Sequence, residues 1–183
     1  MGTRCRALSL TVPAAALLLS GCTAKPAPPS HSARPTTIPS IDAASGAPAE
    51  QATAVYLNLL HAYVAASNSG STDTRELARY ASGSALATLA HGLDTNKAQR
   101  VRTKGQPLIS QPRVSNASAA TDPSQLDLVG CVDDTHWLVY RYDGRLLNNT
   151  PGGPRPTTAR VTKTAGGWRV TLLAIQKVGT CTG

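Results

Sequence analysis

The sequence predicts an α+β domain, in which helices come first and an antiparallel sheet follows. Two observations support this. Apolar residues recur at helical spacing between residues 48 and 93, and after Gly105-Gln106-Pro107 the period becomes alternating, with frequent turn signals. A third observation limits the core: Phe is absent and aromatic residues make up 4% of the chain, so Leu, Val, Ile and Ala must supply most of it.

Three short helices are expected ahead of the sheet. The first begins at Pro48 and ends at Asn68-Ser69-Gly70, because proline suits a first helical turn and glycine commonly follows a last one. Asp73-Thr74-Arg75-Glu76 resembles a capping box and predicts a short second helix. Gly92 is expected to end the third helix as its C-cap. One face of that helix carries Leu86, Leu89, Ala90 and Leu93.

Five strands are expected after the helices, at residues 108–115, 125–132, 137–142, 158–164 and 168–176. Pro112 should break the first strand or place it at an edge, because proline donates no hydrogen bond. Gly166-Gly167 predicts the turn between the last two strands. Asn148 to Pro156 is too rich in Pro and Gly for a strand and predicts an exposed loop. One face of the last strand should carry Trp168, Val170, Leu172 and Ala174.

The first residues read as a bacterial lipoprotein signal. Arg4 and Arg6 precede an apolar run from Ala7 to Leu19, which has the length of a secretory signal and is too short to span a bilayer. Small residues then flank a cut ahead of Cys22, whose thiol would carry a diacylglyceryl group. Residues 1–21 are therefore expected to be removed, and two acyl chains would anchor the protein to the outer face of the cell membrane.

A linker and one domain should follow the anchor. Residues 22–47 are Pro-rich and poor in large apolar residues, which predicts a disordered tether, and residues 48–183 form the domain. Without Arg4 and Arg6 the 18 basic residues become 16 against 10 acidic ones, a net charge of +6. This charge suits anionic headgroups or envelope polymers. Nucleic acid is not expected as a partner in that compartment.

The remaining cysteines predict a disulfide. Because Cys5 leaves with the signal and Cys22 takes the lipid, Cys131 and Cys181 remain in an oxidising compartment. A redox pair and a metal site are the alternatives. The sequence favours neither, since it has no Cys-x-x-Cys and no His at ligand spacing. No metal and no cofactor are expected.

The titratable residues offer weak catalytic candidates only. Asp133 and Asp134, with His136 close by, are the first choice for a general base if a catalytic site exists, but two carboxylates at a turn are the favoured interpretation. His61 falls on the opposite side of the first helix from its apolar stripe, and His91 lies in the last turn of the third helix. Both are expected to be exposed and to have no catalytic role.

A basic cluster lies between the helical and alternating halves. It consists of Lys97, Arg100, Arg102 and Lys104, with Arg113 as an additional member. A solvated surface is the simpler interpretation. The functional interpretation is contact with an anion, either a lipid headgroup or a wall phosphate.

Several local phrases occur in a characteristic order. They are Tyr80-Ala81-Ser82-Gly83-Ser84-Ala85-Leu86, Lys104-Gly105-Gln106-Pro107, Cys131-Val132-Asp133, Pro151-Gly152-Gly153, Gly166-Gly167-Trp168-Arg169-Val170 and Gly179-Thr180-Cys181. In this order they resemble a group of actinobacterial secreted lipoproteins with a nuclear transport factor 2-like domain. The resemblance covers most of residues 48–183 and implies a cone, with three helices closing the concave side of a strongly curved antiparallel sheet. It implies fold and location rather than a reaction.

Two functions follow as hypotheses. The first is a membrane-tethered, non-enzymatic module that binds a ligand or a protein partner at the cell surface, through the cone or through the Asn148 to Pro156 loop. The second is a small extracytoplasmic isomerase or hydrolase that uses Asp133 or Asp134. The first hypothesis is favoured because it requires no buried base.

Overall fold

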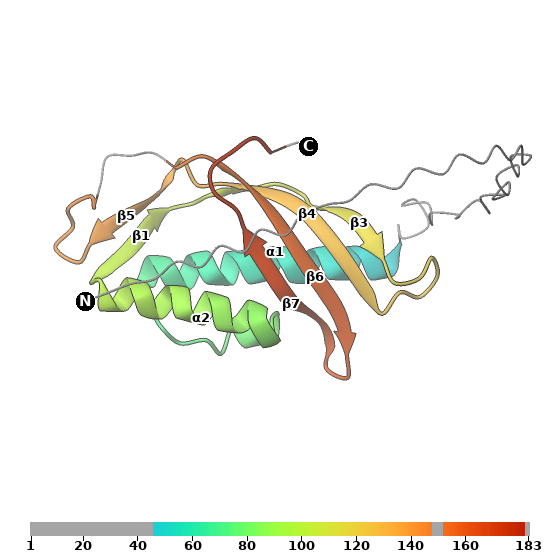
Figure 1. The fold of residues 1–183 in the computed structure, drawn as a ribbon. Coiled ribbons are helices and arrows are strands. Elements are labelled where there is room, and N and C mark those ends of the chain that lie inside the picture. Colours follow the sequence, from blue (N-terminus) through green and yellow to red (C-terminus); the bar gives the residue numbers. More distant parts are fainter. Residues whose placement is uncertain (1–45, 148–151, 182–183) are drawn as a thin grey trace, which may run out of the picture. The chain divides into compact units, whose positions relative to one another are not determined.

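In the computed structural model of the protein, the described residues are 46–147 and 152–181, and all of them belong to one compact unit. The predicted signal peptide and Cys22 lie outside these residues. Figure 1 shows the elements in chain order. They are α1 (Ala47–Ser69), the 3-10 helix η2 (Leu77–Arg79), α2 (Gly83–Ala98), β1 (Val101–Gly105), β2 (Leu108–Ile109), β3 (Arg113–Ala117), β4 (Gln125–Asp133), β5 (Trp137–Arg141), β6 (Pro154–Thr164) and β7 (Gly167–Ile175).

Helix α1 begins and ends where its sequence predicts. Pro48 lies in its first turn, and Gly70 follows it in the left-handed conformation at φ 72°. Glycine adopts that conformation without a side-chain clash, and it lets the Ser71 N–H reach the Ala66 carbonyl at 3.0 Å. The helix buries one side against the sheet, with Ala52, Tyr56, Leu59, Leu60 and Val64 all less than 5% exposed.

The other predicted helices differ from the structure. The second is only the 3-10 turn η2, because Asp73 accepts the Arg75 N–H (3.0 Å) in a local turn rather than capping a longer helix. Residues 46–147 and 152–181 therefore contain two α-helices and a 3-10 turn in place of the three predicted helices. The third predicted helix is α2, and it continues through Gly92 to Ala98. Gly92 is a packing position: a Cβ there would lie 2.7 Å from the hydroxyl of Tyr63 on α1.

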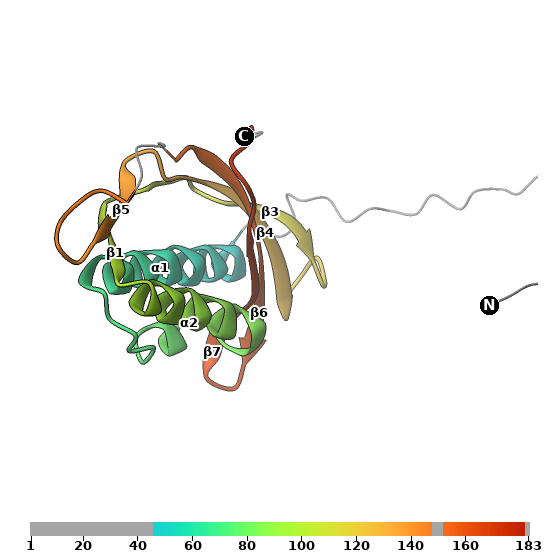
Figure 2. The same ribbon diagram turned by 60° about the vertical axis from the view of Figure 1, so that its left-hand side comes forward.

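All the strand pairs are antiparallel, and together the strands curl strongly around the helices, as Figure 2 shows. Five of them form one sheet, in which four follow the order β2-β4-β6-β7 and β3 also pairs with β4. β1 and β5 form a separate two-stranded sheet. The predicted α+β class with a curved antiparallel sheet is confirmed at this level.

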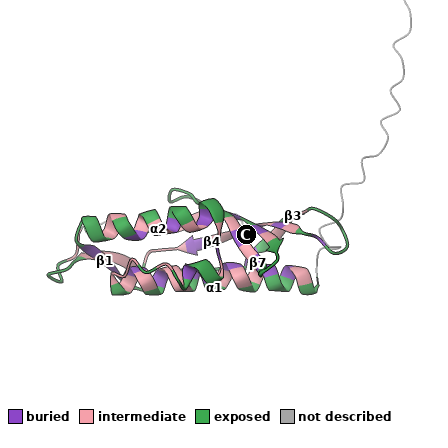
Figure 3. Cartoon of the chain, turned by 90° about the horizontal axis from the view of Figure 1, so that it is seen from below, coloured by how far each residue is buried: buried purple, intermediate pink, exposed green. Residues whose placement is uncertain are grey.

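The core lies between the helices and the inner face of the sheet. Leu126, Leu128, Val161 and Val170 are at most 1% exposed and pack against the buried side of α1 and α2. Figure 3 shows the two helices side by side, with exposed residues along their outward sides. Aliphatic burial therefore fixes the sheet on the helices, as the lack of Phe requires.

Two strand predictions need correction at β6 and β7. β6 starts at Pro154, inside the segment predicted to be a loop. The Pro154 carbonyl accepts the Gly179 N–H (2.9 Å), and the Pro156 carbonyl accepts the Gln176 N–H (3.0 Å). The edge of β6 on which the two prolines lack an N–H therefore faces the tail beyond β7. The remaining donors stay available to β4, and two prolines are tolerated in an inner strand.

The last strand does not keep one face throughout. A bulge opposite Arg160/Val161 shifts the register, so Val170 and Leu173 are buried whereas Leu172 is 45% exposed. The predicted Trp168, Val170, Leu172, Ala174 face is therefore wrong in its second half. The two-residue turn before β7 is also one residue earlier than predicted, at Ala165-Gly166.

Candidate functional site

Asp133 and Asp134, the candidate catalytic acids, lie where β4 ends and the turn to β5 begins. Asp133 Oδ1 accepts hydrogen bonds from the Thr135 N–H (2.9 Å) and the Thr135 hydroxyl. These hydrogen bonds hold the pKa of Asp133 below its usual range. Asp133 is therefore ionised and engaged in a turn.

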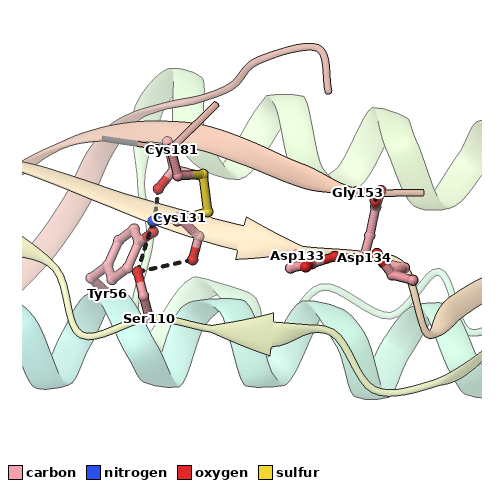
Figure 4. Close-up of a disulfide and its surroundings, with 9 residues drawn as sticks. Tyr56, Ser110, Cys131, Asp133, Asp134, Gly153 and Cys181 are labelled. Atoms are coloured by element: carbon pink, nitrogen blue, oxygen red, sulfur yellow. Dashed lines mark hydrogen bonds between the residues drawn. A yellow bond between two sulfur atoms is a disulfide. The ribbon is translucent and has the colours of Figure 1, made fainter. Parts of the chain in front are cut away.

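Asp134 is engaged as well. Its Oδ1 accepts the Gly153 N–H at 2.6 Å, and its Oδ2 accepts Arg155 Nε at 2.6 Å, in an ion pair whose side chains are 18% and 31% exposed. These contacts fix the start of β6 against the end of β4. Figure 4 shows Gly153 next to Asp134, and both acids well along β4 from the disulfide. His136, the third candidate, is exposed in the same turn, and His61 and His91 are exposed on their helices.

The Cys131–Cys181 disulfide is present, as the sequence predicts, with its Cα atoms 5.9 Å apart. It joins β4 to the C-terminal tail. On the other side of β4, Pro112 interrupts the strand pairing, and Ser110 makes hydrogen bonds to Cys131 there. The Ser110 hydroxyl accepts the Cys131 N–H (2.9 Å), and the Ser110 N–H donates to the Cys131 carbonyl (2.9 Å). This part of β4 is therefore fixed on both sides (Figure 4).

A buried polar pair lies under the same part of β4. The hydroxyls of Tyr56 on α1 and Thr157 on β6 are 2.7 Å apart. Burial raises the pKa of Tyr56, and its hydrogen bond to Thr157 opposes that rise. Gly130 is what admits this pair, since a Cβ there would lie 3.2 Å from both hydroxyl oxygens.

Above this pair, two adjoining hollows lie on the outer face of the five-stranded sheet, and we call them together the outer groove. The first has about 300 Å³ and is bounded by the Ser110-Gln111 link on one side and by Thr180 and Cys181 on the other. The second has about 270 Å³ and reaches the exposed Leu172. Val129 and Thr158 line both.

The outer groove offers recognition groups rather than a catalytic set. Gln111, Arg113 and Thr180 are exposed on its rim, and none of the ion pairs in residues 46–147 and 152–181 involves Arg113. Its second hollow contains the Asp127–Arg160 ion pair, with Arg160 Nε 2.9 Å from Asp127 Oδ1. The groove therefore combines an apolar floor, one free cation and neutral donors. Neither Asp133 nor Asp134 lines it.

The predicted basic cluster divides in the structure. Lys97 lies in the last turn of α2, Arg100 lies in the link to β1, and Arg102 and Lys104 lie on β1. Arg113 belongs to the other sheet, where it lines the outer groove. The cluster is therefore the four residues from Lys97 to Lys104.

Two general features of the described residues bear on the site. No group of three or more His, Cys, Asp or Glu side chains there is arranged to hold a metal ion. None of the helices in that part of the chain is long and apolar enough to cross a membrane.

Comparison with known proteins gives the fold only. No protein-family model matches the chain, and no curated protein does. Among solved structures, it is similar to the intermembrane-space region of the chloroplast protein ARC6 (TM-score 0.51, 10% identity, 70% of this chain and 96% of that one). It is also similar to a putative aromatic ring hydroxylase from Novosphingobium aromaticivorans (TM-score 0.50, 14% identity, 74% of this chain and 94% of that one). At these identities the likeness supports a curled α+β fold and no activity.

The outer groove was not predicted from the sequence. Its floor depends on the outward positions of β4 and β6, and its far end depends on the bulge that turns Leu172 outward. The exposed position of Leu172 follows from a pairing irregularity and not from hydropathy. The disulfide was the one signal that pointed to this area.

Proposed function

We propose that the protein is an extracytoplasmic lipoprotein, anchored through Cys22, whose nuclear transport factor 2-like domain binds a partner protein through the outer groove. The proposal unites the export and lipidation signal in the first 22 residues with a curled sheet whose outer face is hollowed. The groove is the observation that carries the binding role.

The shape and chemistry of the groove suit a protein segment. The two hollows share Val129 and Thr158, so an extended chain laid across them would contact both. Leu172 supplies an apolar contact, and Arg113 is free to pair with a carboxylate. The disulfide and the Ser110 hydrogen bonds make the wall rigid, which lowers the entropic cost of binding.

The alternative, an isomerase or hydrolase that uses Asp133 or Asp134, has no comparable support. A general base needs an oxygen free to reach the substrate proton. Asp134 instead uses both oxygens, on Gly153 and on Arg155. In Asp133, Thr135 occupies Oδ1 only, but its hydrogen bonds lower the pKa of the carboxylate and so make it a weaker base. Both carboxylates have structural contacts that a turn requires.

Site-specific photo-cross-linking on intact cells tests the groove. A photoreactive residue at Thr158 should capture a discrete protein, whereas the same residue at Thr88, exposed on α2, should not. Arg113→Gln should weaken capture about tenfold, as expected if Arg113 pairs with a carboxylate of the partner. Arg79→Gln, which removes an exposed cation elsewhere, should have no effect. Identical capture from both positions would exclude the groove as the binding surface.

Lipidation is tested separately. Cys22→Ser should abolish incorporation of labelled fatty acid and release the protein from the membrane fraction or leave its signal uncleaved. Unchanged labelling of that variant would contradict the anchor without affecting the result at the groove.

A further inference from the structure

Among the described residues, eight Lys and Arg side chains form no ion pair, and four of these eight are close together in the chain. Six ion pairs involve Arg75, Arg79, Arg145, Arg155, Arg160 and Lys163. None of the ion pairs in the described part of the chain includes Lys97, Arg100, Arg102 or Lys104. These four lie within eight consecutive residues, from the last turn of α2 to β1. We call them the basic cluster.

The register of the β1–β5 sheet turns two of these residues away from the helices. Val101 and Thr103 are buried, at 1% and 5% exposure, so Arg102 and Lys104 project to the other face. On that face Arg102 is paired with Tyr140 and Lys104 with Leu138. Lys104 Nζ lies 4.6 Å from the centroid of the Tyr140 ring, so the ammonium is held on an aromatic surface.

Arg100 gives an independent indication. It has φ 55°, a left-handed conformation that costs stability for any residue with a Cβ and that Gly or Asn adopts more readily. The conformation is fixed, because the Arg100 carbonyl accepts the Tyr142 N–H at 3.1 Å. An exposed arginine therefore occupies a position where the backbone favours another residue, and the adjacent Tyr142 is 43% exposed.

We propose that the basic cluster, with Tyr140 and Tyr142, docks the domain on an anionic lipid bilayer. Cations flanked by tyrosine rings match the interface of such a membrane, where headgroups are charged and amphipathic rings are favoured. The inference rests on the envelope location in the proposed function for the source of the bilayer. It uses no residue of the outer groove, and purified protein with synthetic vesicles tests it whether or not Cys22 is lipidated.

Two triple variants that remove the same charge test whether the basic cluster binds the membrane. Both are made in the full chain with Cys22→Ser, so that residues 1–45 contribute equally to every comparison. One carries Lys97→Gln, Arg100→Gln and Lys104→Gln, and the other carries Arg75→Gln, Arg79→Gln and Lys163→Gln, which removes the same charge from ion-paired sites. Arg102 is left unchanged because its Nε is buried without a hydrogen-bond partner among the described residues.

Co-sedimentation with phosphatidylglycerol vesicles gives the readout, with phosphatidylcholine vesicles as the blank. The first triple should lose on the order of 100-fold in partitioning, and the second should stay within about twofold of the parent. Binding of the parent should fall as salt rises from about 0.05 M to about 0.5 M. Equal losses in the two triples would show that net charge alone acts and would overturn the proposal.

Soluble polyphosphate distinguishes a membrane from an anionic polymer. The proposal requires tighter binding to vesicles than to polyphosphate at equal phosphate concentration, because a polymer offers no interface for the two tyrosines. Tighter binding to polyphosphate would overturn the membrane assignment and would favour a wall or storage polymer as the partner.

Arg100→Gly separates charge from folding. Glycine relieves the left-handed strain, so the melting temperature should stay the same or rise. Vesicle partitioning should nevertheless fall about fivefold. If binding is retained, or if it falls only together with the melting temperature, Arg100 has no role in docking and the cluster as proposed is wrong.

Discussion

The five-stranded sheet and the two-stranded β1–β5 sheet are held to the helices in different ways. In the five-stranded sheet, Leu126, Leu128 and Val161 are almost fully buried against α1 and α2, and the Cys131–Cys181 disulfide ties in the tail. This attachment is broad and largely non-directional, because apolar burial scales with area.

In the β1–β5 sheet, one side-chain amide makes hydrogen bonds to both strands. Asn68, in the last turn of α1, accepts hydrogen bonds from the Thr103 hydroxyl (2.6 Å) and from Trp137 Nε1 (3.0 Å), and it donates to the Gly105 carbonyl (2.9 Å). Tyr63 adds an edge-to-face contact with Trp137, at 6.0 Å between ring centroids. Three directional bonds thus join both strands to a single side chain.

This difference separates the two proposed surfaces. The outer groove lies on a sheet braced by core packing and a disulfide, so its shape should survive local changes. The basic cluster lies on and next to a sheet that is held by the buried Val101 and by the Asn68 hydrogen bonds. Loss of Asn68 would leave part-buried donors on that sheet unsatisfied. Stability and exchange measurements should therefore report the two sheets as distinct units.

Removing the disulfide should have the largest effect. The double variant Cys131→Ser, Cys181→Ser lifts a constraint over a separation of 50 residues, which corresponds to a loss of about 4 kcal/mol in unfolding free energy by chain entropy. Urea unfolding measures this loss, with the reduced parent as control. Native-state exchange should rise first at residues 176–181 and beside Cys131. Earlier exchange in β1 and β5 would contradict the comparison.

Core truncation should follow in size. Leu126→Ala empties a position that is 0% exposed and should cost about 3 kcal/mol. Leu172→Ala, an identical substitution at a position 45% exposed on the same sheet, should cost within about 0.5 kcal/mol. Equal costs in urea unfolding would mean that the bulge does not turn Leu172 outward.

Loss of the Asn68 side-chain amide should have a moderate and local effect on stability. Asn68→Ala removes three hydrogen bonds and should cost about 2 kcal/mol, because the Thr103 and Trp137 donors lose their acceptor. Hydrogen exchange should accelerate at residues 101–105 and 137–141 and not in β4. Asn58→Ala, at an exposed position of α1, is the matched control and should leave exchange unchanged.

The same contrast explains what could be predicted from the sequence. Strands β4 and β5, the break at Pro112 and the bounds of α1 all follow from local signals, which are apolar periodicity, a proline and a terminal glycine. The disulfide follows from assigning Cys5 and Cys22 elsewhere. These features require no knowledge of distant contacts.

The missed features depend on distant contacts. Strand β1 shows no apolar alternation, because one of its two buried residues is Thr103, whose hydroxyl is satisfied by Asn68, 35 positions away. The start of β6 contains two prolines that only the tail makes acceptable. The outer face of β7 depends on a bulge, and the outer groove depends on that face. No local pattern encodes these pairings.

The smallest effect should come from the Asp127–Arg160 pair, which contrasts with the unpaired basic cluster. The hydrogen bond from Arg160 lowers the pKa of Asp127, and partial burial opposes the shift. Because the folded pKa lies below the unfolded value of about 3.9, the pair stabilises the fold above that pH, and this contribution is lost as pH falls through the folded pKa. Arg160→Gln should therefore raise the Asp127 pKa in carbon-detected NMR and reduce stability slightly at neutral pH. In acid, where Asp127 is protonated in both proteins, the difference in stability should disappear.

Arg145→Gln, which removes an exposed ion pair formed within one turn, is the control and should leave the Asp127 titration unchanged. A shift of the Asp127 pKa in that control would show that long-range charge, and not the contact with Arg160, sets this pKa. The ion pair on the outer face would then be no different from the unpaired basic cluster, where no specific contact neutralises the charge.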